Sequence, residues 1–513
     1  GGSRSRFKSW QPHQNIYNHA KYFIFMREKP EAITVRKDKD FSEWYSQVIQ
    51  KAELADIRFG VQGFIVQRPL GFFIIKKIYK YLEEEIEKDG HVEFLFPTVV
   101  KEENLKKEKE HAGFTPEVFW VNEAGNKKIE ERFALRPTGE AQIYPLYSLW
   151  FKSHRDLPFK GYQSRISVYR NETTTRPFLR GREFAFFESH DVFNTHEEAL
   201  KQVEKDLEIC KKVIYEKCKI PFLFFKRPQW DKFKGAKDTF TPDTIMPDGK
   251  KNQLASTHDL AQNFAKAFDI KVLNKKESKG YVWQTCFGPG IWRIIAAIIG
   301  IHGDDKGLIL PFDLAPIQIV IVPVLFSDKD ENTIIKRCKE LETKLKKYRI
   351  KFDDTEASPG YKYNYWELRG APIRLEIGPK EIKKNKITLS LRTNSKNKIS
   401  VKIKDLIKEI ERNVALLDKK IEEKANSYFR NKTKEAKSYE GLKKIIKEHR
   451  GFVKVPFCSV DLDGEKCADK LKQDTTANVS GTLYPKEDKV KVGQRCIICN
   501  KLAKHIVYVA KSY

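Results

Sequence analysis

The sequence lacks the features that mark membrane and secreted proteins. Its longest apolar runs, "IIAAIIGI" and "IQIVIVPVLF", are the size of core segments and too short to span a bilayer. The N-terminal stretch "GGSRSRFKSWQPHQNIYNHAKYFIF" has no long apolar region of the kind found in a secretory signal. Internal repeats and long low-complexity tracts are also absent. We therefore expect a globular protein with no membrane association.

Cysteine is sparse and unevenly placed, with eight residues in a chain of 513. Four are scattered, which is not a disulfide framework and indicates a reducing compartment, so we expect a cytoplasmic protein. The other four lie in "FCSVDLDGEKC" and "RCIICN", as C-x8-C and C-x2-C. A thiolate tetrad suits tetrahedral zinc, although four reduced, unliganded thiols remain the alternative. The candidate zinc ligands are Cys458, Cys467, Cys496 and Cys499.

Acidic residues are outnumbered by basic ones, 70 against 97, which gives a formal net charge of +27. Such a surplus favours a polyanionic partner, because neutralising phosphates releases counterions. A lysine-rich proteome or a solubility effect would give the same surplus. The 40% hydrophobic and 12% aromatic content is that of a globular chain with room for about three domains.

Local signals place several elements. Apolar residues at helical spacing predict a helix from Asp40 in "DFSEWYSQVIQKAELAD" and another in "FFIIKKIYKYLEEEIEKDG" that stops at Asp89. A capping box from Thr195 to Glu198 predicts the start of a third helix. Near residue 316 the run "IQIVIVPV" is apolar on both faces, and the strand–helix–strand order that follows predicts a small α/β domain over 316–412.

The hairpin "YRNETTTRPFLRGREF", residues 169–184, is rich in arginine. It is either a solvated, charge-paired hairpin or a clamp for a polyanion. On a strand, Arg170 and Glu172 would share one face, and an arginine fork binds phosphate oxygens two at a time. Phe184 on the returning arm offers a ring on which a base can stack. The arginines are Arg170, Arg176, Arg180 and Arg182.

A second candidate site is "TCFGPGIWRIIAAIIGIHGDD". We expect the glycines and proline of 288–290 to interrupt regular structure, with an apolar helix beginning near Ile291. Glycines at a helix N-terminus favour an anion site. Arg293, in the first turn of this helix, requires exposure, an anion, or an acidic neighbour.

These segments resemble motifs 1, 2 and 3 of the class II aminoacyl-tRNA synthetases: a helix and strand ending in Pro97, the Arg-x-Glu hairpin, and the glycine-rich strand and helix with Arg293. Within that class, "ALRPTGEAQIYPLY", "SHRDLPFK", "TRPFLRGREF", "HGDDKGLILPFDLAPIQIVIVPV" and "GAPIRLEIGPKEI" resemble prolyl-tRNA synthetases of the archaeal and eukaryotic type. The similarity runs from about residue 40 to Tyr513.

The resemblance implies an α/β (α+β) fold in four parts. An N-terminal extension, 1–39, precedes a class II catalytic domain with an antiparallel sheet core, 40–315. An α/β anticodon-binding domain, 316–412, and a small zinc-binding-like α/β domain, 413–513, follow. The first 25 residues of the extension are basic and contain no acidic residue. It could be the remnant of an organelle-targeting segment or an unstructured addition.

The resemblance also implies the activity. It is that of a proline–tRNA ligase, which activates L-proline with ATP to prolyl-adenylate and transfers proline to the 3′-terminal ribose of tRNA(Pro). Mg²⁺ would bridge the ATP phosphates. No covalent nucleophile is required, which agrees with the lack of any triad-like signature. A homodimer is implied because the helix and Pro97 strand resemble the class II dimer seam.

The resemblance also implies roles for individual residues. Arg170 would grip the α-phosphate and lie near the substrate carboxylate, Glu172 would read adenine, and Arg293 would lie against adenine and the γ-phosphate. Added ATP contacts are Arg180 on the loop, Phe184 against the base and Gln253 at the ribose. Thr138 and Glu140, expected two apart on an extended segment, would face the secondary ammonium of proline. The ring pocket would comprise Phe186, His190, Phe233, Ser256 and His258.

Alternative interpretations remain at this point. One is a class II synthetase with another specificity, or with dual proline and cysteine use. Another is a catalytically inactive, synthetase-like tRNA-binding protein, against which Arg170, Glu172 and Arg293 argue. An apolar pocket rejects a similar-sized competitor only by roughly tenfold to a few hundredfold, so we expect measurable activation of alanine or cysteine. There is no room between motifs 2 and 3 for a large editing insertion.

Overall fold

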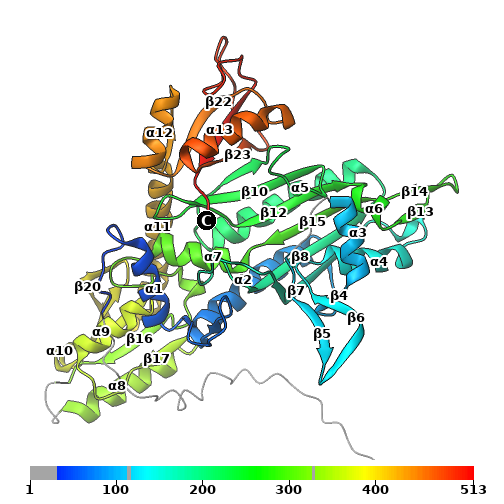
Figure 1. Cartoon of the computed structure of the whole chain (residues 1–513). Helices are drawn as coiled ribbons and strands as arrows, with labels where there is room; N and C mark the ends of the chain where they lie inside the picture. Colours follow the sequence, from blue (N-terminus) through cyan, green and yellow to red (C-terminus); the bar gives the residue numbers. More distant parts are fainter. Residues whose placement is uncertain (1–31, 113–116, 326–329) are drawn as a thin grey trace, which may run out of the picture.

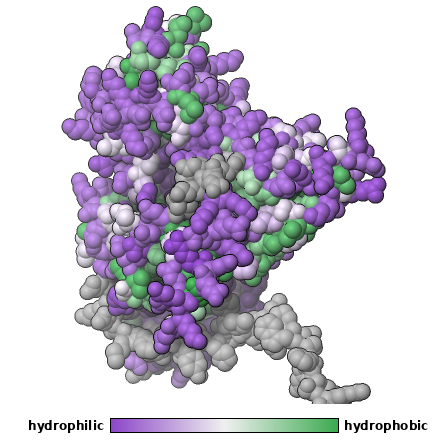
Figure 2. Space-filling view, turned by 45° about the vertical axis from the view of Figure 1, so that its right-hand side comes forward, coloured by the Kyte–Doolittle hydropathy of each residue, from purple (hydrophilic) through white to green (hydrophobic). Residues whose placement is uncertain are grey.

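The computed structural model describes residues 32–112, 117–325 and 330–513 (Figure 1). Most of the predicted N-terminal extension, residues 1–31, lies outside the described residues. No helix in the described part of the chain is long and apolar enough to cross a membrane. All eight cysteines are free. The face seen in Figure 2 is mainly hydrophilic, as the high charge content predicts.

A twelve-stranded sheet organises the centre of the molecule. Its central strands run antiparallel. In spatial order they are β9 (Leu223–Lys226), β10 (Asp238–Ile245), β12 (Ala255–Ala261), β15 (Trp283–Pro289), β8 (Glu183–Phe193) and β7 (Phe159–Tyr169). Short β3 (Val92–Glu93) lies parallel to β7 at one edge, and β11 (Lys251–Gln253) pairs with β10.

The strands of the C-terminal part continue the same sheet. β23 (Asn478–Leu483) pairs with β9, and β24 (His505–Ala510), β22 (Phe452–Phe457) and β21 (Thr433–Glu435) follow in order. Helices α12 (Tyr439–Glu448) and α13 (Glu465–Thr475) accompany them at the top of Figure 1. The C-terminal part is therefore built onto the central sheet.

The largest core lies on one face of the sheet. Tyr162, Phe187 and Phe287 contribute to it from β7, β8 and β15. It is lined by α1 (Phe41–Lys51), α2 (Pro69–Lys88) and α7 (Ile291–Ala297). A second core contains residues of α4 (Glu140–Trp150) and α6 (Asn263–Ala267) together with Val192 and Cys286. Helix α5 (His196–Cys210) contacts β12 and β15.

Predicted helix boundaries are confirmed where the sequence carries a cap. Asp40 accepts a hydrogen bond from Glu43 N at 3.0 Å before α1, and Thr195 and Glu198 form the capping box of α5. Asp89 is the C-cap of α2. One expectation was wrong: the glycine and proline before α7 do not interrupt the strand. β15 runs to Pro289, because a proline at the last strand position removes no essential ladder bond.

A separate five-stranded sheet forms the small α/β domain. Its order is β17 (Ile350–Phe352), β16 (Ile319–Pro323), β18 (Ile373–Ile377), β19 (Lys386–Leu391) and β20 (Asn394–Lys402). All five residues of β16 are buried and it pairs in parallel on both sides, which confirms a strand covered on two faces. The helices are α8 (Glu331–Lys344), α9 (Pro359–Leu368), α10 (Pro379–Lys384) and α11 (Leu406–Asn431).

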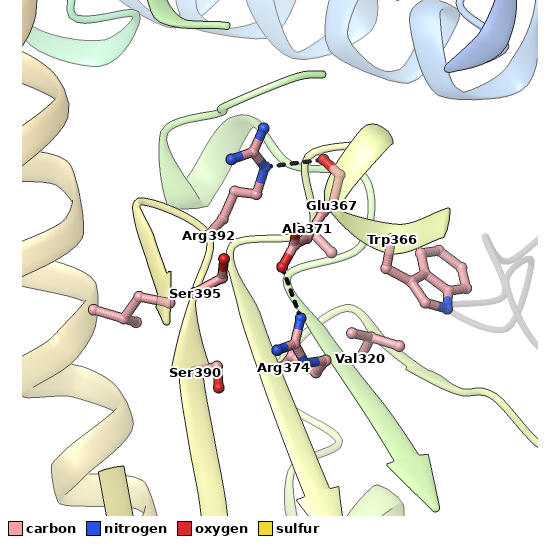
Figure 3. A pocket seen from close by; sticks show the side chains of 9 residues that line it. Val320, Trp366, Glu367, Ala371, Arg374, Ser390, Arg392 and Ser395 are labelled. Atoms are coloured by element: carbon pink, nitrogen blue, oxygen red, sulfur yellow. Dashed lines mark hydrogen bonds and ion pairs between the residues drawn. The ribbon is translucent and has the colours of Figure 1, made fainter. Parts of the chain in front are cut away.

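An ion-paired seam joins this domain to the loop that follows the α7 region. Arg392 Nη1 donates to Asp304 Oδ2 at 3.0 Å, and its Nε donates to the main-chain oxygen of Glu367 at 2.9 Å. Lys306 Nζ reaches Glu367 Oε2 at 2.8 Å. Figure 3 shows Arg392 and Arg374 approaching Glu367 around a cavity of about 10 Å³, which has room for no more than a single water. The seam is therefore a structural joint.

The remaining elements flank the central sheet. A three-stranded sheet has the order β4, β6, β5, and two pairs of short strands form separate ribbons. They are β4 (Val99–Lys101), β5 (Trp120–Ala124), β6 (Lys127–Leu135), α3 (Glu102–Ala112), β1 (Ala55–Asp56), β2 (Val66–Gln67), β13 (Lys271–Leu273) and β14 (Lys279–Tyr281).

Candidate active site

Three neighbouring strands place side chains in a row on one face of the sheet. His190 on β8 is the partner of Cys286 on β15, which is the partner of His258 on β12. Because side chains alternate along a strand, residues two positions away share this face. Several of these residues were predicted from the sequence, but Glu188 and Cys286 were not, and Gly288 was predicted only as part of an anion site. The alternation from His190 would have indicated Glu188, but only the pairing register identifies the other two.

Glu188 and His190 form a buried ionic pair, with His190 Nε2 3.2 Å from Glu188 Oε2. Glu188 also accepts from Gly139 N at 3.1 Å and from Gln163 Nε2 at 2.6 Å. Burial opposes the charge on both groups, but their attraction outweighs it. It lowers the pKa of Glu188 and raises the pKa of His190. The pair is therefore ionised, with one more carboxylate beside it.

That carboxylate is Glu140, which is buried. Thr138 Oγ1 donates to Glu140 Oε2 at 2.5 Å, so the two side chains do face each other. The expected extended segment was wrong, because Glu140 is the first residue of α4 and the close approach comes from the bend before the helix. Cys286 Sγ lies 3.6 Å from Glu140 Oε1.

His258 closes the other side of the pocket as a neutral imidazole. Its Nδ1 bonds with Thr239 Oγ1 at 2.9 Å and its Nε2 with Ser256 Oγ at 3.1 Å. Burial, with the positive charge of His190, lowers the pKa of His258 to about 3. The Phe233 ring lies 5.0 Å from the imidazole, which adds an apolar wall.

Gly288 leaves space at the floor of this pocket. A Cβ at this position would lie 3.2 Å from Phe186 Cζ and 3.9 Å from Ser256 Oγ. Any side chain would therefore occupy the space between Phe186 and Ser256.

The arginine hairpin lies beside this pocket. The prediction that Arg170 and Glu172 share one face of a strand was wrong. β7 ends at Tyr169, and both residues belong to the connecting loop. Glu172 instead accepts from Arg180 Nη1 at 3.2 Å. The guanidinium of Arg170 is 6.0 Å from the centroid of the Phe184 ring. A cation and an aromatic ring therefore lie close together at this end of the hairpin.

Arg293 lies half-buried in the first turn of α7, and its Nη1 donates to Gln253 O at 3.4 Å. Among the described residues no carboxylate lies within ion-pair distance, so the acidic-neighbour alternative is not observed. Burial, with the positive charges of Arg170 and Arg180, lowers the pKa of Arg293 to about 10. Asp243 and Glu172 offset this effect only in part, so three guanidinium groups converge in this region with an excess of positive charge.

Gln253 sits at the edge of this cationic region. Its side-chain oxygen accepts from Arg227 Nη2 at 3.1 Å, and Arg227 also pairs with the buried Asp243 at 2.9 Å. The amide of Gln253 is thus oriented by Arg227. A cavity of about 440 Å³ adjoins the region and is bounded in part by Arg180, Gly181 and Trp292.

Tyr513 reaches the same region from the far end of the sequence. Arg180 Nη2 donates to the main-chain oxygen of Tyr513 at 2.8 Å, and Tyr513 OH donates to Asp248 Oδ1 at 2.8 Å. Figure 1 places this end of the chain near the middle of the molecule. No role was predicted for Tyr513, because no local sequence pattern indicates this contact.

The four C-terminal cysteines converge. Their sulfur atoms all lie within 4.8 Å of one another, and the Sγ atoms of Cys458 and Cys467 are 3.7 Å apart. Tetrahedral zinc–thiolate geometry requires about 3.8 Å between sulfurs, so the tetrad fits such an ion. Burial raises the pKa of Cys458 to about 11, so a cation must displace thiol protons to bind.

The antiparallel sheet, the arginine hairpin and the Arg293 helix define a class II aminoacyl-tRNA synthetase. Three family descriptions match the chain: "tRNA synthetase class II core domain (G, H, P, S and T)" over residues 119–302, "Anticodon binding domain" over 318–413, and "Prolyl-tRNA synthetase, C-terminal" over 439–513.

Individual relatives show which member of this class the chain resembles. The proline–tRNA ligase of Thermofilum pendens is 50% identical over 94% of this chain and 99% of its own length. That of Pyrococcus abyssi is 39% identical over 93% of this chain and 99% of its own length. The Giardia lamblia prolyl-tRNA synthetase, solved with prolyl-adenylate, superposes with a TM-score of 0.89 at 32% identity and covers 94% of this chain and 100% of that one. The chain belongs to the proline–tRNA ligase family and is an ATP-dependent aminoacyl-tRNA ligase. The predicted family, fold class and activity are confirmed.

Proposed function

We propose that the pocket on β8, β15 and β12 binds L-proline and that the arginines beside it bind ATP. The observation that carries this assignment is the opposite charge of two adjoining regions. The pocket holds two buried carboxylates against one imidazolium, whereas the hairpin and α7 gather three guanidinium groups, of which Arg180 is paired with Glu172. An amino acid needs an acidic site for its ammonium, and a triphosphate needs a cationic one.

In the proline pocket, the Glu140 carboxylate accepts a hydrogen bond from the secondary ammonium of proline. Thr138 holds this carboxylate in place. Glu188 reinforces the negative field from beneath. The pyrrolidine ring has no polar group, so it packs against Phe186 and the aromatic wall. The neutral state of His258 matters here, because a cation at that position would repel the ammonium. The other wall residues are His190, Phe233 and Ser256.

In the nucleotide site, Arg170 holds the α-phosphate and the substrate carboxylate, and Arg293 lies against adenine and the γ-phosphate. Phe184 stacks on the base, which its position 6.0 Å from the Arg170 guanidinium supports. Glu172 contacts adenine only after its ion pair with Arg180 opens, which releases Arg180 toward the triphosphate or the tRNA acceptor end. Gln253 contacts the ribose, and Mg²⁺ accompanies the phosphates.

The reaction has two steps. The proline carboxylate attacks the α-phosphorus in line, forming prolyl-adenylate and releasing pyrophosphate. The terminal ribose hydroxyl of tRNA(Pro) then attacks the acyl carbon and AMP leaves. Fixed guanidinium groups stabilise charge that grows on the phosphate oxygens, and orientation supplies most of the remaining rate enhancement.

The finer organisation is also a proposal. Cys458, Cys467, Cys496 and Cys499 hold a structural zinc that stabilises the C-terminal part. The division is 1–39, 40–315, 316–412 and 413–513, with 316–412 contacting the tRNA anticodon. A homodimer forms through the α2 and β3 region, where Phe72, Val92 and Leu95 are 45%, 54% and 77% exposed. The protein acts in the cytoplasm.

Pyrophosphate exchange measured with each amino acid tests the pocket assignment. We expect exchange with proline, weaker exchange with alanine and cysteine, and a loss of at least about 100-fold in Arg170→Ala. Preference for another amino acid would support the other class II specificity. Exchange unaffected by Arg170→Ala would contradict the clamp.

A further inference from the structure

A second group of possible metal ligands lies in the pocket. It consists of a carboxylate, an imidazole and a thiol, from Glu140, His190 and Cys286. They come from α4, β8 and β15, all three are buried, and one ligand atom of each lies within 4.8 Å of the others. The Cys286 sulfur and Glu140 Oε1 are 3.6 Å apart. Ligand atoms on one tetrahedral zinc ion are about 3.3–3.8 Å apart, so only small side-chain movements would complete the site.

His190 is held ready for a ligand. Its Nδ1 bonds with Tyr144 OH at 2.9 Å, which fixes the ring as an outer partner fixes a metal-binding histidine. Its Nε2 is buried and faces Glu188 Oε2 at 3.2 Å, as an ion pair without a hydrogen bond. A cation bound at Nε2 would therefore take the place of the proton that now faces Glu188.

The donor set selects the kind of ion. Thiolate, imidazole and carboxylate together suit zinc and other thiophilic divalent cations, whereas Mg²⁺ prefers oxygen ligands alone. One thiolate and one carboxylate would neutralise a divalent charge.

We propose that Glu140, His190 and Cys286 form a site for Zn²⁺ or a similar thiophilic cation, distinct from the cysteine tetrad, and that its occupancy excludes proline. The exclusion rests on the proposed role of this pocket, because the cation takes the same Glu140 carboxylate that receives the ammonium. The expected behaviour is reversible inhibition that is competitive with proline and relieved by chelation.

Direct binding is tested with Co²⁺, added to full-length protein whose tetrad is already loaded with zinc. We expect a Co²⁺–thiolate charge-transfer band in the wild type that disappears in Cys286→Ser and is suppressed by proline. Metal analysis confirms that the tetrad zinc stays in place. No band, or a band that survives Cys286→Ser, would overturn the cation site. A band that needs Cys286 but persists in saturating proline would instead refute the placement of proline there.

Inhibition provides the second readout. In proline-dependent pyrophosphate exchange, Zn²⁺ should raise the KM for proline and leave kcat unchanged. Relative to its own uninhibited rate, Cys286→Ser should require at least tenfold more Zn²⁺. Cys338→Ser, which changes a buried thiol in the small α/β domain, should be inhibited like the wild type. Inhibition that is not competitive with proline, or that Cys286→Ser leaves unchanged, would reject the proposal.

Discussion

Replacing Arg293 by methionine should stabilise the ligand-free protein while it abolishes activation. Methionine keeps much of the length and removes the charge. In the structure the half-buried guanidinium has one long hydrogen bond, to Gln253 O at 3.4 Å, and faces the positive charges of Arg170 and Arg180. The ligand-free site thus holds a cation whose charge is not compensated by an ion pair with the protein.

The size of the expected stabilisation follows from the pKa of Arg293, which is lowered to about 10 from a much higher ordinary value. That difference corresponds to at most about 3 kcal/mol, and solvent at this half-buried position reduces it to about 1–2 kcal/mol. The folded state binds this proton more weakly than the unfolded chain does. The penalty is therefore fully present at neutral pH and fades as the pH rises above about 10.

The assay is unfolding at pH 7 with and without a non-hydrolysable ATP analogue and Mg²⁺. Arg293→Met should raise the free energy of unfolding by about 1–2 kcal/mol without ligand, lose the stabilisation by the analogue, and reduce pyrophosphate exchange at least about 100-fold. Arg155→Met, which changes an exposed arginine, should alter none of these. A less stable ligand-free variant, or one that the analogue still stabilises, would refute the reasoning.

Four further outcomes are expected. Gly288→Ala should raise the KM for proline roughly tenfold and leave that for ATP unchanged in exchange kinetics, since the new Cβ would lie 3.2 Å from Phe186 Cζ. His258, with a folded-state pKa of about 3, binds its proton more weakly than the unfolded chain. Stability should therefore fall by about 3 kcal/mol between pH 7 and pH 4, and denaturant titrations should show less of this fall in His258→Gln. Arg392→Ala, which breaks the seam to Asp304, should lower tRNA aminoacylation about tenfold but change pyrophosphate exchange by less than about twofold. Cys499→Ser should lower the zinc content measured by metal analysis and reduce thermal stability, because structural zinc contributes on the order of 10 kcal/mol.

The elements that the sequence predicts correctly carry their information locally. Asp40 and the pair Thr195–Glu198 cap helices within one turn, and the apolar run of β16 identifies a covered strand without reference to its neighbours. By contrast, Cys286 becomes part of the pocket only because its strand pairs in one register with His190 and His258. A shift of one residue would send it to the opposite face.

Long-range pairing also brings together parts of the chain that local sequence signals do not connect. The C-terminal part has a hydrophobic cluster of its own, and β23 also extends the central sheet by pairing with β9, more than 200 residues earlier in the chain. Tyr513 reaches Arg180 by the same arrangement. No local pattern could indicate either contact, because both depend on how the strands assemble.

The two charged regions also explain how proline is oriented in the proposed site. Glu140 and Glu188 attract the ammonium and repel the carboxylate, whereas Arg170 at the neighbouring site attracts the carboxylate. A zwitterion placed between them has one favourable orientation, with its carboxylate directed toward the phosphates. The same electrostatic field disfavours the reversed orientation of each substrate. The attacking oxygen of proline therefore faces the α-phosphorus of ATP without any covalent attachment to the protein. The uncompensated charges lower the stability of the ligand-free site, and each is compensated only when its own substrate is bound.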